Sequence, residues 1–280
     1  MFEFIATKND AGRTLIKLLQ KYLNNLPNSK IEKIFRKKDV KVNGKRTNQK
    51  DLIINENDQV VIYGIFDASV ASTTVNTKPN LIILYEDEHI LVLNKQAGVE
   101  VHGSDNSLDN QVLSYLNYKQ VDSFKPSHIG RLDKETSGII VYGKTYLAVS
   151  RLNEHNHQFT KKYQFQSEFN GPEQTLKLYL YKDETNKKVK ASKVEVPNSK
   201  LAITKLYIEN KKKIAEILTG KKHQIRVSLQ FIGKPIYGDR RYGGKKMDRL
   251  MLHSYYLKLS GLTGELKYLN NMEFYALAKW

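Results

Sequence analysis

Four charged residues stand close together just before a short apolar run, in the segment 127–144 with the sequence SHIGRLDKETSGIIVYGK. The charged positions are Arg131, Asp133, Lys134 and Glu135. Residues 139–142 are β-branched or aromatic and predict a buried strand. Loops on rigid scaffolds often carry catalytic groups, so we expect this loop to hold the Asp133 carboxylate at the edge of a pocket. A carboxylate placed there can attack an electron-poor carbon, as the nucleophile of a glycosidase does.

Short strands and helices alternate through residues 80–280, and their spacing lacks the regularity of strand–helix–strand repeats. The expected strands lie at 81–85, 90–94, 138–143, 161–169 and 252–259. The expected helices lie at 107–116, 145–156 and 223–233. This mixture indicates an α+β domain whose largely antiparallel sheet positions the charged loop. We therefore assign residues 80–280 to one catalytic domain.

A small separate module precedes this domain, and we assign it residues 1–65. Apolar residues at helical spacing predict two short helices, at 12–23 and 29–38. Ser29 and Glu32 fit a capping box at the start of the second helix. A hairpin is expected around Asn43-Gly44, with another strand at 58–63.

The second expected helix of this module has a basic face. Its candidate RNA contacts are Lys30, Lys33, Arg36 and Lys37. The segment 26–46, LPNSKIEKIFRKKDVKVNGKR, resembles the S4 RNA-binding domain, and the resemblance implies that this module binds RNA. The alternative is a helical module with a solvated charged face. Residues 66–79 are rich in Ser, Thr and Ala and are expected to be a flexible linker.

The charge of the chain points to a polyanionic partner. Among 280 residues, Lys and Arg number 46 against 29 Asp and Glu, which gives a formal net charge of +17. Nucleic acid is the first candidate for such a partner and an anionic membrane surface the second. A Lys-rich composition inherited from an A·T-rich genome is the alternative source of part of this excess.

Several functional classes are excluded by composition. The chain has no cysteine, which excludes disulfides, cysteine nucleophiles, zinc ribbons and iron–sulfur clusters. His155 and His157 lack a carboxylate at metal-ligand spacing, so we expect no metal site. The N-terminal segment has an early acidic residue and no long apolar stretch, and no run approaches the roughly 20 apolar residues of a membrane span. We expect a cytoplasmic protein without a membrane partner.

Four segments, in this order along the chain, resemble the motifs of the RluA-type pseudouridine synthases. They are ILVLNKQAGVEVHG at 90–103, GRLDKETSG at 130–138, FTKKYQF at 159–165 and LTGKKHQIRVSLQFIGKPIYGDRRYGG at 218–244. The resemblance implies the pseudouridine synthase fold, with a bent, largely antiparallel mixed sheet flanked by helices. Together with the S4-like module, it covers nearly the whole chain. The module looks most like that of the C-type enzymes, which act on large-subunit ribosomal RNA.

The resemblance also implies roles for particular residues. Asp133 takes the position of the catalytic aspartate, Tyr163 that of the active-site tyrosine and Arg226 that of the active-site arginine. Arg131 matches the arginine implicated in displacing the target base from its stack. Further substrate contacts are expected at Lys95, Lys162 and His223. Taken singly, each of these side chains also has a structural interpretation, such as a turn Asp, a solvated Lys or a core Tyr.

The implied reaction converts a uridine within RNA into its C-glycoside isomer. The N1–C1′ bond breaks, the uracil turns over, and C5 bonds to C1′. Asp133 can attack either C1′ or C6, and the sequence does not decide between them. Burial disfavours a charged carboxylate, and we expect Arg226 to offset this by gripping Asp133 through two hydrogen bonds. The reaction needs no redox change, phosphate or metal, so we expect no cofactor.

The sequence departs from the family pattern at a few positions. Gln96 replaces the usual proline, Gly130 stands where many relatives have histidine, and Lys221-Lys222 replaces the usual Arg-Thr. Gly-Arg-Leu-Asp also occurs in other branches of the superfamily, which leaves the branch open. We expect a monomeric enzyme that acts on 23S ribosomal RNA. The alternatives are a synthase for transfer or messenger RNA and a non-catalytic RNA-binding or ribosome-assembly protein.

Overall fold

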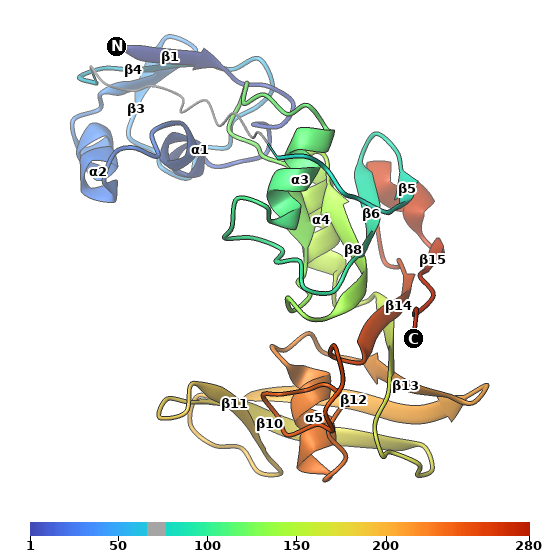
Figure 1. The fold of residues 1–280 in the computed structure, drawn as a ribbon. Helices are drawn as coiled ribbons and strands as arrows, with labels where there is room; N and C mark the ends of the chain where they lie inside the picture. Colours follow the sequence, from blue (N-terminus) through green and yellow to red (C-terminus); the bar gives the residue numbers. More distant parts are fainter. Residues whose placement is uncertain (66–76) are drawn as a thin grey trace. The chain divides into compact units, whose positions relative to one another are not determined.

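The computed structural model describes residues 1–65 and 77–280. Residues 66–76, which form most of the expected linker, lie outside the described residues. The described residues form two compact units. The first unit contains residues 1–65 together with Leu113–Pro126 and Thr145–Leu147, and the second contains Thr77–Val112, Ser127–Lys144 and Ala148–Trp280. Each unit is described by itself (Figure 1).

The first unit packs two helices against a small antiparallel sheet. The helices are α1 (Leu15–Tyr22) and α2 (Asn28–Arg36). The strands are β1 (Phe2–Ile5), β2 (Val40–Val42), β3 (Lys45–Thr47) and β4 (Gln59–Ile62), in the order β1-β4-β2-β3. Apolar side chains of both helices and of the sheet share one buried core. The two expected helices, the hairpin around Asn43-Gly44 and the strand near 58–63 are confirmed.

Two details of this unit differ from expectation. The capping box at Ser29 and Glu32 is wrong, because α2 begins at Asn28 with Pro27 as its N-cap and no side-chain cap bond is made. Proline fixes φ near the value needed at a helix start, and Pro27 has φ −66°. Strand β1 was not expected. It occupies the otherwise open edge of β4 through the register Phe2↔Ile62.

The second unit is built on one mixed sheet of eleven strands among the described residues. The strands of its first half are β5 (Ile83–Glu86), β6 (Ile90–Lys95), β7 (Ser127–Ile129), β8 (Ser137–Gly143) and β9 (Thr160–Phe165). Those of its second half are β10 (Gln174–Asp183), β11 (Lys188–Ser192), β12 (Lys200–Glu209), β13 (Lys212–Ile217), β14 (Leu252–Lys258) and β15 (Glu273–Tyr275). All paired neighbours run antiparallel except β8 and β14. The predicted mixed, largely antiparallel sheet is therefore confirmed.

Helices complete the second part of the chain. They are α3 (Leu108–Tyr115), α4 (Tyr146–His155) and α5 (Gln224–Phe231), with a 3-10 turn at Gly264–Leu269. Helix α5 packs on β10, β11 and β12, as Figure 1 shows. No helix within 1–65 or 77–280 combines the length and the apolar character that crossing a membrane requires.

Three neighbouring strands position the charged loop. In the parallel pair, Ser254 of β14 lies beside Gly138 of β8, and in the antiparallel pair it lies beside Tyr163 of β9. Gly138 has φ +114°, and a Cβ there would stand 2.1 Å from the backbone oxygen of Ser254. Only glycine permits both this conformation and this close approach. The loop that enters β8 is thereby held near Tyr163.

Candidate active site

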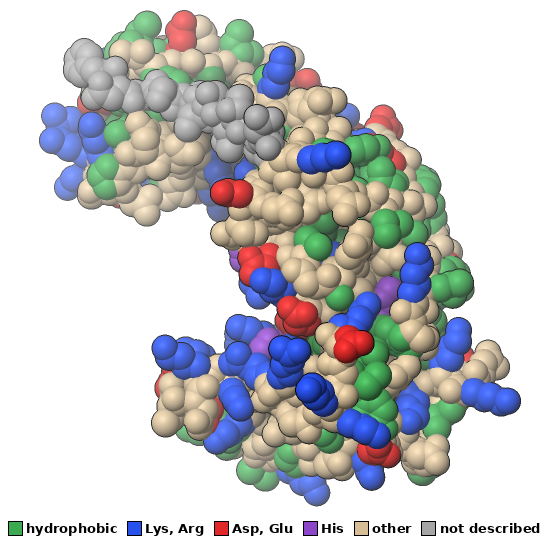
Figure 2. All heavy atoms as spheres, viewed as in Figure 1, with side chains coloured by type: hydrophobic (Ala, Val, Ile, Leu, Met, Phe, Trp, Pro, Cys, Tyr) green, Lys and Arg blue, Asp and Glu red, His purple; other side chains and the backbone are tan. Residues whose placement is uncertain are grey.

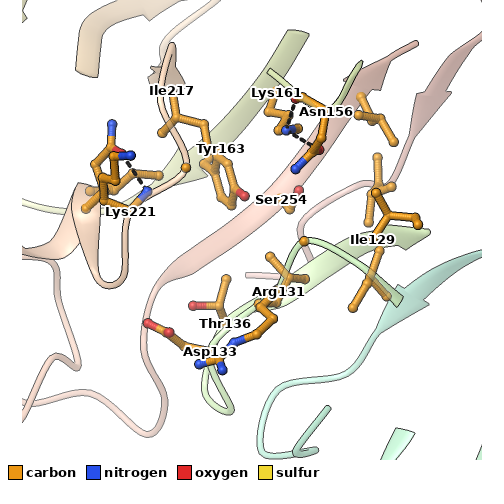
Figure 3. Close-up of a pocket in the computed structure, with 18 of the residues that line it drawn as sticks. Ile129, Arg131, Asp133, Thr136, Asn156, Lys161, Tyr163, Ile217, Lys221 and Ser254 are labelled. Carbon is orange, nitrogen blue, oxygen red and sulfur yellow. Dashed lines mark hydrogen bonds between the residues drawn. The ribbon is translucent and has the colours of Figure 1, made fainter. Parts of the chain in front are cut away.

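A cavity of about 640 Å³ opens within the second unit. Its lining comes from the loop 128–133, from β8, β9 and β14, and from the segment 220–226 that leads into α5. Asp133, Tyr163, Arg226, Arg131 and His223 all contribute to this lining. The structure thus brings together five of the seven site residues expected in the catalytic domain. Figure 3 shows Arg131, Asp133 and Thr136 on one loop, with Tyr163 on a strand beside them.

Arg226 joins two aspartates. Its Nη1 donates a hydrogen bond of 3.0 Å to Oδ2 of Asp133. Its Nε and Nη2 donate bonds of 2.7 and 2.9 Å to the two oxygens of Asp239. The expected contact between Arg226 and Asp133 is present, but the two-bond grip is made on Asp239 and not on Asp133. Burial alone would lower the pKa of Arg226, yet the hydrogen bonds and charges of Asp239 and Asp133 raise it, so the guanidinium remains charged.

Asp239 is placed by the backbone that follows it. Its side chain is fully buried, and Oδ1 also accepts bonds of 3.1 Å from the backbone N–H groups of Arg241 and Tyr242. A buried carboxylate with this many donors is held in one geometry. Asp133 is less enclosed, with its side chain 24% exposed. Among the described residues, no hydrogen bond reaches Oδ1 of Asp133, so this oxygen is available to a substrate.

His223 adds a second group beside Asp133. Its Nε2 lies 3.6 Å from Oδ2 of Asp133, and its Nδ1 lies 2.7 Å from the hydroxyl of Tyr242. Burial lowers the pKa of His223 to about 4, although the charge of Asp133 acts in the opposite direction. The imidazole is therefore neutral at pH 7. A proton on Nε2 faces the carboxylate favourably, and this tautomer requires Nδ1 to accept the Tyr242 hydroxyl proton.

Tyr163 forms part of the cavity wall opposite the loop. It is 9% exposed, and it lies in register with Ser254 of β14. Burial raises the pKa of Tyr163 to about 12; a hydrogen bond from Ser254 opposes this shift and the charge of Asp133 adds to it. The phenol is therefore neutral near pH 7. It offers a flat face for a base and a hydroxyl that can donate or relay a proton.

Arg131 is a cationic group of the cavity without a partner among the described residues. It is exposed, and it lines the cavity from the loop that carries Asp133. Within residues 1–65 and 77–280, its guanidinium forms no ion pair or hydrogen bond. A free planar cation next to a cavity can stack on a nucleic-acid base.

Lys95, expected as a substrate contact, is not among the residues that line the cavity. Its side chain is 1% exposed, and Nζ donates bonds of 2.9 Å to the carbonyls of Gln96, Val99 and Lys134. Burial lowers the pKa of Lys95 to about 8, against the charge of Glu135. Because Lys134 follows Asp133, Lys95 anchors the loop that carries Asp133.

Lys162, also expected as a substrate contact, is likewise not among the lining residues. Successive side chains of a strand point to opposite faces, and Tyr163 occupies the cavity face of β9. Lys162 lies on the other face, with Nζ 5.3 Å from the ring centre of Tyr256 and 5.9 Å from that of Tyr207. The lysine of β9 that lines the cavity is its neighbour Lys161, which was not expected.

The sequence contained signals for the residues that were missed. Asp239 belongs to the Gly-Asp of the last family-like segment, and Tyr242 to the Tyr-Gly that follows. Lys161 precedes Tyr163 by two residues, and that spacing places two side chains of a strand on the same face.

Exposed cations gather on the second unit and on α2. On the second unit they include Lys187, Lys188, Lys190, Lys222, Arg240 and Arg241. Figure 2 shows Lys and Arg side chains crowded over β11, α5 and the segment after α5. On the first unit, the expected RNA contacts Lys30, Lys33, Arg36 and Lys37 are all exposed, while Ile31, Ile34 and Phe35 of the same helix are buried.

Comparison with known proteins identifies the family. The family model described as RNA pseudouridylate synthase matches residues 89–231. An RNA pseudouridine synthase of Mycoplasma capricolum is 36% identical, with 97% of this chain and 96% of the relative covered. Ribosomal large subunit pseudouridine synthase C of Vibrio parahaemolyticus is 31% identical over 91% of this chain and 88% of its own. The synthase C of Escherichia coli is 32% identical over 87% of this chain and 80% of its own.

Solved structures support the same fold. Human RNA pseudouridylate synthase domain containing 1 matches with a TM-score of 0.56 and 22% identity, covering 67% of this chain and 84% of that chain. Human RNA pseudouridylate synthase domain containing 4 matches with a TM-score of 0.54 and 21% identity, covering 71% and 88%. The predicted pseudouridine synthase fold and the predicted family are confirmed. The chain belongs to the RNA pseudouridine synthases, and it resembles the large-subunit synthase C enzymes over most of its length.

Proposed function

We propose that this RNA pseudouridine synthase modifies specific uridines of 23S ribosomal RNA, with Asp133 as its nucleophile. The choice of RNA is supported by relatives named ribosomal large subunit pseudouridine synthase C, at 31% and 32% identity. The choice of nucleophile is supported by one observation above all. Asp133 is bonded to the charged Arg226 at 3.0 Å and presents its other oxygen to a cavity.

Asp133 starts the reaction as a carboxylate. Attack on C1′ forms an ester-like bond to the sugar while the N1–C1′ bond breaks, and the uracil leaves with the electron pair. The freed uracil turns over, C5 bonds to C1′, and the carboxylate departs. The C5 proton is lost and N1 gains one, so the product is an isomer of the substrate. Attack on C6 is the alternative first step and uses the same carboxylate. The bond from Arg226 places a positive charge beside Asp133 and fixes the direction of its carboxylate.

Tyr163 holds the base during this exchange. Its ring gives the uracil a stacking surface inside the cavity, where the glycosidic bond must break and re-form without loss of the base. The raised pKa of Tyr163 keeps its phenol protonated at neutral pH. Tyr163 therefore donates or relays a proton and does not act as a phenolate base. Ser254, its hydrogen-bond partner, is the next group in that relay.

Arg131 assists the entry of the nucleotide. A base inside a helix must leave its stack, at a cost of a few kcal/mol. The free guanidinium of Arg131 is planar and charged, so it can fill the vacated place and stack on the neighbouring bases. The exposed cations of the second unit supply affinity for the phosphates, and this affinity falls with rising salt.

We also propose that residues 1–65 are an S4-like RNA-binding domain. Its α2 exposes Lys30, Lys33, Arg36 and Lys37 over a buried apolar face. A basic helix face that is not needed for the core is suited to the phosphates of a structured RNA. Such a domain would direct the enzyme to a large folded RNA.

The experiment that tests the function is pseudouridine mapping. Wild-type enzyme and Asp133→Ala are incubated with unmodified 23S ribosomal RNA, transfer RNA and messenger RNA, and each pool is mapped at single-nucleotide resolution. We expect product in 23S RNA with wild type alone. Product confined to transfer or messenger RNA would overturn the substrate assignment. Equal product from both proteins would overturn the nucleophile assignment, and background-level signal from both on RNA that they bind would overturn the proposed activity.

The role of the first unit is tested separately by removing residues 1–79. On large folded ribosomal RNA we expect kcat/KM to fall. A short stem-loop with the same target uridine should be affected much less, because it has no remote contacts to lose. An equal loss on both RNAs, or no loss on either, contradicts a targeting role. A milder variant, Lys33→Gln with Lys37→Gln, keeps the chain intact and should reproduce part of the loss.

A further inference from the structure

Lys161 is a half-buried cation in the cavity that the mechanism above does not use. It lies on β9 two residues before Tyr163, and both side chains line the cavity. A strand rises about 3.4 Å per residue, so the two side chains are about 7 Å apart along the strand. This is comparable with the separation of the base and the phosphate within one nucleotide.

The hydrogen bonds of Lys161 leave it with an unmet donor. Nζ donates two bonds of 2.6 Å, one to the backbone oxygen of Asn156 and one to its side-chain oxygen Oδ1. An ammonium has three N–H groups, and the third finds no acceptor among the described residues. Both bonds are drawn in Figure 3, where the Asn156 amide nitrogen turns toward the cavity.

Asn156 also has hydrogen-bond donors that no acceptor meets among the described residues. Since its Oδ1 accepts from Lys161, its Nδ2 is left with two donors, and within 1–65 and 77–280 no acceptor meets them. Asn156 lines the cavity, and its Nδ2 is 3.6 Å from the place a Cβ of Gly130 would occupy. A larger residue at Gly130 would crowd the amide. Lys161 and Asn156 together therefore present only donors to whatever enters.

No anion neutralises this lysine in the free protein. Packed around it are the rings and chains of Phe159 and Leu257, with the Lys161 ammonium 5.5 Å from the Phe159 ring centre. The loop 128–133 brings His128, which bonds Asp109, and the solvent-facing Arg131. The end of α4 brings His155 and Glu154, whose carboxylate accepts a 2.9 Å bond from Arg151. Burial lowers the pKa of Lys161 to about 8, and no neighbouring charge opposes it.

We propose that Lys161 and Asn156 form a binding site for one backbone phosphate of the RNA, next to the nucleotide that enters the cavity. An unneutralised cation in an apolar wall favours an anion over a neutral carbonyl. The anion that must accompany a flipped nucleotide is its own or an adjoining phosphate. The inference rests on the proposed catalytic use of this cavity and adds to it the group that fixes the sugar over Asp133.

Proton linkage predicts that the Kd for RNA depends on pH through this site. Binding of a phosphate stabilises the charged lysine, so RNA affinity is constant well below pH 8. Above about pH 8 the free protein loses the proton, and Kd rises by up to tenfold per pH unit. Lys95, whose pKa is also about 8, titrates in the same range, so the dependence on Lys161 is read from variants.

The test measures Kd from pH 6.5 to 9.5 in the Asp133→Asn background, which prevents turnover. The probe is a synthetic stem-loop with whichever uridine the wild-type enzyme converts, from any class of RNA, so the result does not depend on the ribosomal assignment. Lys161→Met should bind about 10- to 100-fold more weakly at pH 7 and lose the rise in Kd above pH 8. Lys161→Arg, which stays charged throughout, should bind equally well at pH 7 and pH 9.

Lys162→Met is the matched control, because it removes one charge from the opposite face of the same strand. It should keep the rise in Kd above pH 8.

Single methylphosphonates around the target uridine then locate the anion. One of them should flatten the dependence of Kd on pH for the protein that has Lys161, without weakening the binding of Lys161→Met further. The proposal is overturned if Lys161→Met keeps the wild-type dependence of Kd on pH. It is also overturned if no methylphosphonate flattens that dependence while removal of a carbonyl oxygen from a base does. If Lys161→Met fails to fold, the Lys161→Arg profile decides. Pseudouridine formed by Asp133→Asn itself would instead show that the nucleophile assignment had failed.

Discussion

Arg226 donates a single hydrogen bond, 3.0 Å long, to Asp133, and its Nε and Nη2 donate two hydrogen bonds to Asp239. The fully buried Asp239 carries the two-bond contact that fixes the plane of the arginine. Asp133 is thereby oriented through one oxygen and free at the other. Asp239 thus holds the arginine, while Asp133 keeps one oxygen for the substrate. The guanidinium places a positive charge beside the proposed nucleophile without enclosing it.

Asp239→Asn should therefore lower the activity, although it leaves the Asp133 side chain unchanged. The amide cannot accept two bonds from the guanidinium, so Arg226 is expected to shift toward Asp133 and to hold its second oxygen. We expect kcat to fall on the order of 100-fold, and the free energy of unfolding to fall by about 3 kcal/mol because a buried charge loses its partner. Single-turnover kinetics and urea unfolding measure both. Asp248→Asn, an exposed carboxylate of the same segment, is the control, and equal kinetics in the two variants would refute the assignment.

Tyr242→Phe should act through His223. Without the hydroxyl that lies 2.7 Å from Nδ1, the imidazole is free to adopt the tautomer that turns a lone pair toward Asp133. We expect kcat to fall about tenfold with little change in KM. The double variant with His223→Gln should lose no more than His223→Gln alone, because both changes remove one interaction. Additive losses in the double variant would mean that Tyr242 acts independently. Tyr237→Phe, whose hydroxyl bonds the exposed Glu168, is the matched control.

Lys95→Met should destabilise the protein from behind the catalytic loop. Three carbonyls lose the ammonium donor, of which that of Lys134 keeps the Gly98 N–H, and the lost bonds to a charged donor cost on the order of 3 kcal/mol in total. Chemical unfolding should show this loss, and kcat should fall because the carbonyl of Lys134 is one of the three. Lys134→Met removes only a salt bridge whose lysine is 53% exposed, and such pairs contribute about 0–1 kcal/mol. A Lys95→Met protein as stable as Lys134→Met would contradict the anchoring role.

Acid should weaken the fold through His253. Its Nε2 lies 3.0 Å from the Ala276 carbonyl and its Nδ1 lies 2.7 Å from the Ser137 hydroxyl, so Nε2 donates and Nδ1 accepts in the neutral ring. Burial lowers the pKa of His253 to about 4, against about 6.5 in the unfolded chain. The unfolded state thus binds more protons between these values, and the free energy of unfolding falls as the pH drops from about 6.5 to 4. The loss from this residue is about 3 kcal/mol.

Histidine resonances followed by NMR against pH provide the measurement. The His253 signal should titrate near pH 4, whereas the exposed His157 serves as the reference in the same spectrum. His253→Asn should show a shallower fall in stability between pH 6.5 and pH 4 than the wild type. A His253 signal that titrates near 6.5, or an unchanged slope in the variant, would contradict the account.

Local patterns predicted those parts of the fold that local forces decide. The apolar spacing of α1 and α2 and the β-branched run of β8 specify a buried face without help from distant residues. Strands β10 to β13 were not predicted individually, although they form much of the sheet. Their alternation of Lys and Thr with apolar residues gives little contrast in a chain so rich in lysine, and their register is set only by pairing with each other.

The candidate site divides in the same way. The types of Asp133, Tyr163 and Arg226 and their place in family-like segments were sufficient to predict that they meet. Which face of β9 points to the cavity was not decided by the family-like segment alone, and Lys162 was chosen where Lys161 lines it. The position of Lys95 outside the cavity lining could not be predicted, because its ammonium bonds carbonyls of Gln96, Val99 and Lys134, and the last of these comes from a distant loop. The partner that grips Arg226 could have been inferred from the Gly-Asp at 238–239, but only the folded chain brings that turn under α5.

The most direct test of the account is a single-turnover reaction of wild type and Asp133→Asn with a 23S RNA fragment that the wild type modifies, with RNA binding measured on the same samples. Asparagine keeps the shape of the side chain and removes its charge and nucleophilicity. We predict that Asp133→Asn binds the RNA within about tenfold of wild type and forms no pseudouridine. Full conversion of the uridine by the Asp133→Asn protein would contradict the central claim.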